Sequence, residues 1–207
     1  MKVDLIRPLL FRLAVMAAHV MRRERPLLDF GRRCRFDKAC SIKLGKRSIL
    51  RLGDKVALRG GCVIDLGREG DLALGDLAEI RHYAIIECGG RVSIGKRSVI
   101  GAYNWLQGSG VIEIGDDVII GPGVRIISTT HDVSDPDLPF ARQPLISGSV
   151  RIGSNVWIGA DVVILTGVRI GKNVVVGAGS LVTRDLEDGG IYVGTPARRI
   201  KKVQTNL

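Results

Sequence analysis

The stretch that decides the fold is RIGSNVWIGADVVILTGVRIGKNVVVGAGSLV, residues 151–182. Within it an aliphatic residue recurs at every sixth position without a break: Ile152, Ile158, Ile164, Ile170, Val176 and Val182. Glycine follows four of these six residues, and a small or β-branched residue often stands four positions after them. A short repeat of this kind is typical of solenoids, in which each turn of chain packs only on its neighbours.

The same period continues upstream in triplets: Leu74, Ile80 and Ile86, then Ile94, Ile100 and Leu106, then Ile114, Ile120 and Ile126. The first members of successive triplets lie 20 residues apart, so each turn has three sides. An aliphatic residue on each side can line the interior of a coil made of short strands, and glycine after it permits corner conformations that a Cβ would obstruct. No helical period of about 3.6 residues appears between residues 40 and 185. We therefore predict an all-β fold, a parallel β-helix of hexapeptide repeats.

The composition agrees with a narrow coil and limits the kinds of partner that the protein is expected to bind. The chain has 27 glycines and only 4% aromatic residues, as expected for tight corners around a thin core. Its net charge of +10 implies an anionic partner, but no aromatic platform accompanies the basic ends, so we do not expect nucleic acid. The cysteines form no CxxC pair and the histidines lack zinc-finger spacing, so we expect no metal site and reduced thiols in the cytoplasm.

The N-terminal segment, residues 1–35, is basic and differs from the repeat. Its apolar part, Leu9–Met21, is interrupted by Arg12 and is too short to span a bilayer. We predict an amphipathic helical segment that packs either against the β domain or on an anionic membrane surface, which would place the protein at the inner face of the membrane. Residues 36–207 then form the β-helical domain, ending in a short basic tail.

The repeat is broken once. After Ile126 the next clean hexad begins at Ile152, and the polar, proline-containing segment 128–148 lies between them. Loops inserted into a solenoid usually collect on its functional side. His131 stands at the start of this loop, and histidine is suited to act as a general base near neutral pH.

These features together resemble a known family. The pattern over residues 44–202 is similar to the left-handed β-helix of hexapeptide-repeat acyltransferases. Its later part resembles the galactoside, maltose and nodulation-type sugar O-acetyltransferases, through Asn104, the loop opened by His131, Asn155–Gly159, Gly177–Ser180 and Gly194–Arg198. The resemblance implies left-handed winding, a homotrimer with active sites between neighbouring subunits, and acetyl-CoA as the acyl donor.

The resemblance also implies roles for individual residues. His131 corresponds to the catalytic base, while Asn104 and Trp157 correspond to contacts with the acceptor. The positions that correspond to contacts with CoA are Ala160, Ala178, Thr183, Arg198 and Lys201.

Structural roles for some of these residues remain open: Asn104 could belong to a corner ladder, and Trp157 could cover a neighbouring coil. The group that orients the imidazole is also open, between Asp132, Asp135, Asp137 and a backbone carbonyl.

The function expected from this pattern is transfer of an acetyl group from acetyl-CoA to a hydroxyl of a sugar, within a glycan or a glycan precursor. The enzymatic alternatives are N-acetylation of an amino sugar on a nucleotide carrier and acetylation of a xenobiotic hydroxyl. A non-catalytic β-helical scaffold is the alternative of another class. A zinc-dependent carbonic anhydrase on the same coil is excluded, because His19, His82 and His131 do not have the spacing of its ligands.

Overall fold

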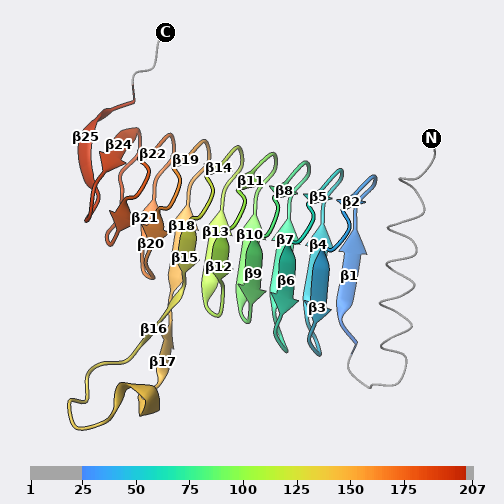
Figure 1. The fold of residues 1–207 in the computed structure, drawn as a ribbon, viewed down its shortest axis with the longest axis horizontal. Coiled ribbons are helices and arrows are strands. Elements are labelled where there is room, and N and C mark those ends of the chain that lie inside the picture. Colours follow the sequence, from blue (N-terminus) through green and yellow to red (C-terminus); the bar gives the residue numbers. More distant parts are fainter. Residues whose placement is uncertain (1–24, 204–207) are drawn as a thin grey trace.

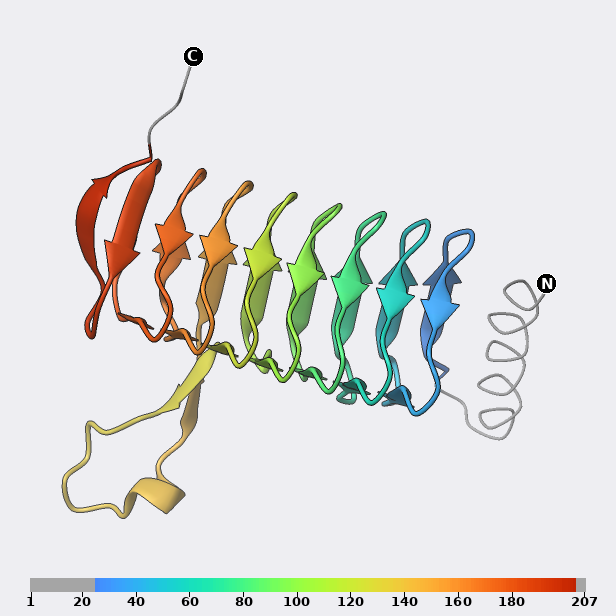
Figure 2. The same ribbon diagram turned by 45° about the horizontal axis from the view of Figure 1, so that its top comes forward.

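The computed structural model describes residues 25–203. Over this range the chain winds into a row of three-sided coils, about 20 residues each, with one hairpin that leaves the row between the fifth and sixth coils (Figures 1 and 2). Each side of the coil contributes one short strand, and each strand pairs with the equivalent strand of the next coil. The stacked sides therefore form three long sheets, which we name A, B and C in the order in which the chain visits them.

Sheet A holds seven parallel strands in chain order, one per coil. They are β1 (Leu27–Phe30), β4 (Ile49–Leu52), β7 (Asp71–Leu74), β10 (Arg91–Ile94), β13 (Val111–Ile114), β18 (Ser149–Ile152) and β21 (Arg169–Ile170).

Sheet B is the longest and ends in an antiparallel pair. Its strands are β2 (Arg35–Phe36), β5 (Ala57–Leu58), β8 (Glu79–Ile80), β11 (Val99–Ile100), β14 (Ile119–Ile120), β19 (Trp157–Ile158), β22 (Val175–Val176), β24 (Gly190–Val193) and β25 (Arg198–Lys202). Since β25 runs against β24, it closes the end of the sheet, and the predicted basic tail is a strand as far as Lys202.

Sheet C completes each coil and leads to the next one. It consists of β3 (Ser41–Leu44), β6 (Val63–Leu66), β9 (Ile85–Cys88), β12 (Trp105–Gln107), β15 (Arg125–Ile127), β20 (Val163–Ile164) and β23 (Leu181–Val182).

The interior is a column of aliphatic side chains, as the period predicts. All six hexad residues of the quoted stretch are buried, from Ile152 to Val182, and the triplet residues Ile80, Ile100 and Ile120 lie beneath one another in sheet B. The small residues four positions later, such as Val156 and Ser180, fill the inner corners. Burying each such side chain contributes roughly 1.5–3 kcal/mol, so the stack supplies what no single coil could.

The hexad glycines do not provide the special corner conformation predicted for them. Gly153 and Gly171 do not adopt the left-handed backbone conformation; that conformation falls two residues later, at Asn155 and Asn173, with φ of 56° and 55°. A Cβ on Gly153 would instead lie 2.8 Å from the carbonyl carbon of Gly171 in the next coil. Glycine is needed here because stacked corners approach closely, not because the backbone turns in a special way.

The predicted helical segment 1–35 lies partly outside the described residues, which begin at residue 25. For the part that the structure describes the prediction is wrong, since Leu27–Phe30 and Arg35–Phe36 are strands of the first coil. Phe30 pairs in register with Leu52, and Phe36 with Leu58. These aromatic residues occupy the inward positions that aliphatic residues fill elsewhere, and for that reason the repeat is hard to see at this end.

The coil predicts that neighbouring residues of one strand differ sharply in what they contribute to the free energy of unfolding. Ile86 in β9 is fully buried, whereas the side chain of Ile85 points outward and is 38% exposed. We expect Ile86→Ala to lower the free energy of unfolding by about 2–5 kcal/mol, and Ile85→Ala by no more than about 1 kcal/mol. Denaturant unfolding of both variants measures this, and equal losses would contradict the assignment of the inward face.

Candidate active site

The break in the repeat is a hairpin rooted at the corner between sheets C and A. It leaves after β15 as β16 (Thr129–His131), passes through a short 3-10 helix η1 (Phe140–Arg142), and returns as β17 (Leu145–Ser147) into β18. β16 and β17 pair antiparallel, so His131 lies opposite Leu145. The hairpin projects away from the row of coils, as both ribbon views show (Figures 1 and 2).

Ser128 fixes the root of the hairpin. Its buried hydroxyl donates to the carbonyl of Gln107 at 2.8 Å and accepts from the N–H of Gly110 at 3.0 Å. Its carbonyl accepts from the N–H of Gly148 at 2.8 Å and from the hydroxyl of Thr166 at 3.1 Å. One residue thus ties the fourth and sixth coils together where the chain departs.

Gln143 holds the far part of the hairpin together. Its side-chain amide is buried and donates at 2.9 Å to the carbonyls of both Asp135 and Leu138. Sequence reasoning missed this residue. The signal was present, because Gln143 is the single amide side chain in a loop otherwise made of charged, hydroxyl, proline and apolar residues.

His131 is exposed on β16, and within residues 25–203 its imidazole makes no hydrogen bond. The aspartates considered for orienting it are engaged in turns of the loop. Asp132 accepts from the N–H of Ser134, which lowers the pKa of this carboxyl, and Asp135 accepts from the N–H of Asp137. Neither carboxylate is hydrogen-bonded to the imidazole, so neither orients it in this structure.

Asn104 lies inside the coil, at the corner between sheets B and C. It is 1% exposed, and its amide oxygen accepts from the N–H of Val124 in the next coil at 2.7 Å. Its amide nitrogen is buried without a hydrogen-bond partner in the described chain. This arrangement is the corner ladder left open by the sequence; contact with a substrate stays a prediction that would require the corner to open.

Ala160 and Ala178 occupy the same place in successive coils, at the outer corner between sheets B and C. The N–H of Gly179 donates to the carbonyl of Ala160, which stacks the two corners. The N–H groups of Ala160 and Ala178 themselves have no acceptor within residues 25–203. Small side chains beside unpaired N–H groups fit a ligand that runs along the corner and offers carbonyl oxygens.

The C-terminal motif packs against this same corner. The N–H of Gly194 donates to the hydroxyl of Ser180 at 3.1 Å, and the N–H of Ala197 donates to the carbonyl of Leu181 at 2.8 Å. Arg198 and Lys201 follow in β25, and both are exposed. The structure therefore brings Ala178 together with the basic strand that the resemblance assigns to CoA.

Thr183 and Trp157 lie on different sides of the coil. Leu181 pairs with Val163, so Thr183 lies one coil beyond Leu165, near the corner where the hairpin leaves. Trp157 is in sheet B, points outward and is 57% exposed. In a three-sided coil the corner between sheets C and A is opposite sheet B, so one chain cannot bring His131 and Trp157 to the same site.

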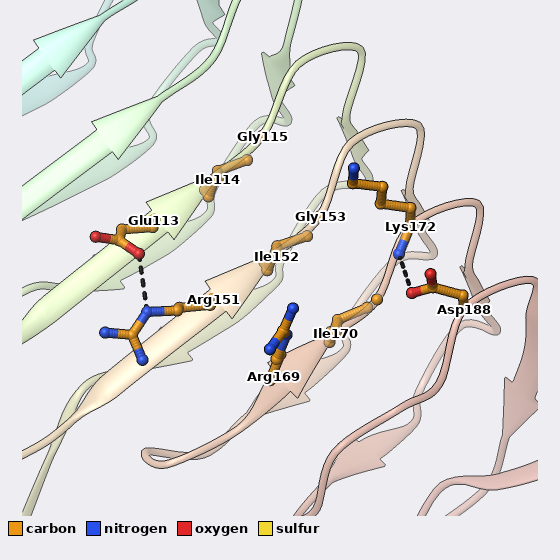
Figure 3. A pocket seen from close by; sticks show the side chains of 11 residues that line it. Glu113, Ile114, Gly115, Arg151, Ile152, Gly153, Arg169, Ile170, Lys172 and Asp188 are labelled. Carbon is orange, nitrogen blue, oxygen red and sulfur yellow. Dashed lines mark hydrogen bonds and ion pairs between the residues drawn. The ribbon is translucent and has the colours of Figure 1, made fainter.

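A depression of about 550 Å³ lies on sheet A across the last coils (Figure 3). Arg151, Arg169 and Lys172 give it a basic character, and Arg151 donates to Glu113 at 2.9 Å. None of the residues predicted for the active site lines it. It offers cations but no imidazole or thiol, so we do not assign the chemistry to it.

Between residues 25 and 203, no group of three or more histidine, cysteine, aspartate or glutamate side chains is placed to hold a metal ion. Nor does this part form a helix with the length and apolar character that crossing a membrane requires.

The hydrogen bonds of Gln143 predict a local effect of its removal. We expect Gln143→Ala to open the hairpin tip while leaving the coil intact, because two carbonyls lose their donor at a cost of roughly 1–3 kcal/mol confined to the loop. Limited proteolysis should then cut segment 132–142 faster, with Arg142→Ala, an exposed neighbour, as the control. Equal cleavage of the two variants would show that Gln143 does not order the loop.

Comparison with known proteins places the coil among transferases. The family described as "Bacterial transferase hexapeptide (six repeats)" matches residues 149–184. The galactoside O-acetyltransferase of Lactococcus lactis is 49% identical over 92 residues, which cover 44% of each chain. Nodulation protein L of Rhizobium meliloti is 42% identical over 112 residues, 53% of this chain and 59% of that protein. The chain thus spans about half the length of the curated relatives it matches.

Solved structures extend the match to most of the chain. A mutant of AntD, an N-acyltransferase from Bacillus cereus in complex with dTDP and coenzyme A, is 30% identical over 80% of this chain and 84% of that one, with a TM-score of 0.56. The polySia-specific acetyltransferase NeuO, at 24% identity and 87% coverage of both chains, shares the fold with a TM-score of 0.69. On the residues of its repeat and on these matches, the chain belongs to the bacterial hexapeptide-repeat transferases.

Proposed function

We propose that this protein transfers an acetyl group from acetyl-CoA to a hydroxyl of a sugar in a glycan or glycan precursor, with His131 as the general base. The observation that carries the proposal is the hairpin of residues 129–147. It interrupts the regular coil and presents an exposed histidine, while a different corner of the following coils has unpaired N–H groups. The names of the galactoside O-acetyltransferases among its relatives support the acceptor class.

The chemistry follows from these parts. The imidazole of His131 takes the proton of the acceptor hydroxyl as its oxygen attacks the thioester carbonyl. The resulting oxyanion needs N–H donors, and the bond to sulfur then breaks, so that the thiolate leaves and receives the proton from the imidazolium. Ala160, Ala178, Arg198 and Lys201 would hold the donor. Thr183, which the resemblance also assigns to the donor, lies near the other corner, between sheets C and A. Trp157 and Asn104 would contact the acceptor.

The active site is completed by a second copy of the chain. His131 and Trp157 lie on opposite sides of one coil, so a site that uses both must take them from two chains. A homotrimer of left-handed coils, which the family resemblance implies, provides three such sites between neighbours. The cytoplasm, where acetyl-CoA is available, is the proposed location, and contact of segment 1–35 with the inner face of the membrane is part of the same proposal.

N-acylation of an amino sugar carried by a nucleotide is a second candidate. It is favoured by the similarity to AntD, whose structures include one with dTDP-4-amino-4,6-dideoxyglucose and coenzyme A, 28% identical at a TM-score of 0.56. The two reactions share the donor and the base, and differ in the nucleophile. Assaying matched acceptors that carry a hydroxyl or an amine at the same carbon distinguishes them.

If His131 is the general base, replacing it should slow the reaction without weakening the binding of acetyl-CoA. We expect His131→Ala to bind acetyl-CoA as tightly as the wild type in calorimetry, but to release free thiol roughly 10²–10⁴ times more slowly, because only proton transfer is removed. His82→Ala, which changes the other histidine of the described chain, is the control. Unchanged thiol release by His131→Ala would overturn the assignment of the base.

The shared site predicts complementation between inactive variants. Neither His131→Ala nor Trp157→Ala alone should transfer acetyl groups well. Refolding the two together should restore about a quarter of the wild-type rate, since a site between mixed chains then receives both intact residues. A mixture no more active than its components would mean that each site is built from one chain.

A further inference from the structure

The positive charge of the protein is concentrated in its first two coils. Residues 25–59 contain 11 arginines and lysines against 3 aspartates, a net charge of +8. Residues 60–203 contain 15 basic and 16 acidic residues, a net charge of −1. The coils that carry the hairpin and the predicted CoA corner are therefore close to neutral, and no step of the acetyl transfer proposed above uses the basic end of the molecule.

Within this basic end, sheet B has a basin with Ala57 as its floor. In register, Ala57 lies between Arg35 of the first coil and Glu79 of the third. Along its own coil it is flanked by Lys55 and Arg59. Since the alanine side chain is a single methyl surrounded by long side chains, a concave space of about 450 Å³ remains, whose wall also includes Arg33.

Most of the cations of the basin lack a counter-charge. Arg59 is engaged, because its Nε donates to Glu79 at 2.7 Å, and this uses the one carboxylate that lines the space. Within residues 25–203, no carboxylate pairs with Arg33, Arg35 or Lys55. Strands of adjacent coils are about 4.8 Å apart, so the Cα atoms of these three residues lie within about 10 Å of one another. Their mutual repulsion would be relieved by a bound anion.

Two exposed tyrosines stand at the corner between sheets B and C, in the third and fourth coils, and indicate what kind of anion this end of the molecule suits. Arg81 lies next to Arg59 in sheet B, and the corner that follows carries Tyr83. The rings of Tyr83 and Tyr103 stack at a centroid distance of 5.2 Å and an angle of 12°, and the residues are 55% and 65% exposed. Aromatic rings with a phenol hydroxyl pack against the C–H faces of sugars and also hydrogen-bond to their hydroxyls.

We propose that this surface, the basin around Ala57 together with Tyr83 and Tyr103, binds an acidic glycan, with a carboxylate or phosphate of the polymer in the basin. The inference rests on the proposed transferase function and narrows its acceptor to an anionic glycan long enough to reach the active site. The basin lies four coils, or about 19 Å, from Trp157 along sheet B. The basin would therefore hold a part of the glycan chain that is well away from the sugar unit that is acetylated.

Direct binding tests the surface without depending on catalysis. In the absence of acetyl-CoA, the full chain is titrated with octagalacturonate and with maltooctaose, an acidic and a neutral sugar chain of equal length. We expect octagalacturonate to bind at least about tenfold more tightly, with an affinity that falls as salt rises. Because no acetyl transfer is involved, this result stands or falls apart from the role of His131.

Variants with matched controls locate the site. Arg35→Gln/Lys55→Gln should weaken octagalacturonate binding about tenfold or more, whereas Lys43→Gln/Lys46→Gln removes the same charge from other faces of the first coil and should have little effect. Ala57→Glu fills the floor with a carboxylate beside Arg35 and Lys55, so it should abolish binding. Its control is Ala73→Glu, at an outward position of sheet A beside Arg51.

Several outcomes would overturn the proposal. They are the absence of octagalacturonate binding, equal binding of maltooctaose, and basin variants that bind no worse than their controls. Vesicles containing phosphatidylglycerol are the remaining comparison. If these bind in a manner that depends on Arg35 and Lys55 while octagalacturonate does not, the basin recognises a lipid surface and the glycan assignment is wrong.

Discussion

The structure depends on one constraint, the stacking of each coil on the next at the spacing of a parallel sheet, about 4.8 Å. At this distance every inward side chain must fit beneath its equivalent, which explains why isoleucine, leucine and valine make up most of the column. The corners must approach as closely as the sides, which explains why glycine follows so many of the hexad residues. A coil held in this way can accept extra residues only where the chain leaves the stack at a corner, and the hairpin of residues 129–147 does so between sheets C and A.

Much of this architecture could be predicted from the sequence, because a period of six reports directly which residues point inward. The prediction from this period failed where the inward residues change type, as with Phe30 and Phe36 in the first coil. It also could not show what a polar residue does at a corner. Asn104 and Ser98 both occupy inner corners and bond to the backbone of the next coil, although one of them also matches a family substrate residue. Gln143 acts through the fold of the loop, for which the repeat carries no information.

The candidate site shows a further limit of sequence reasoning. His131, Trp157 and Ala160 lie within 30 residues of one another, but the corner and sides of the coil separate them. The coil presents the histidine on one edge, the predicted donor corner on another and the tryptophan on the side opposite the hairpin. The same rigidity that forbids one chain from assembling the site makes two chains suitable, because each holds its part of the site in a fixed place. The basic coils at the other end are where we propose that a long anionic acceptor binds.

Hydrogen exchange with and without CoA tests the central claim, that the donor lies along the outer corner of sheets B and C and meets the hairpin of a second chain. The account predicts slower exchange in segments 159–161, 177–179 and 194–198, together with segment 129–147, in the assembled protein. If CoA instead protects the depression on sheet A, around Arg151, Arg169 and Lys172, and leaves the hairpin unchanged, both the donor corner and the role of His131 are contradicted.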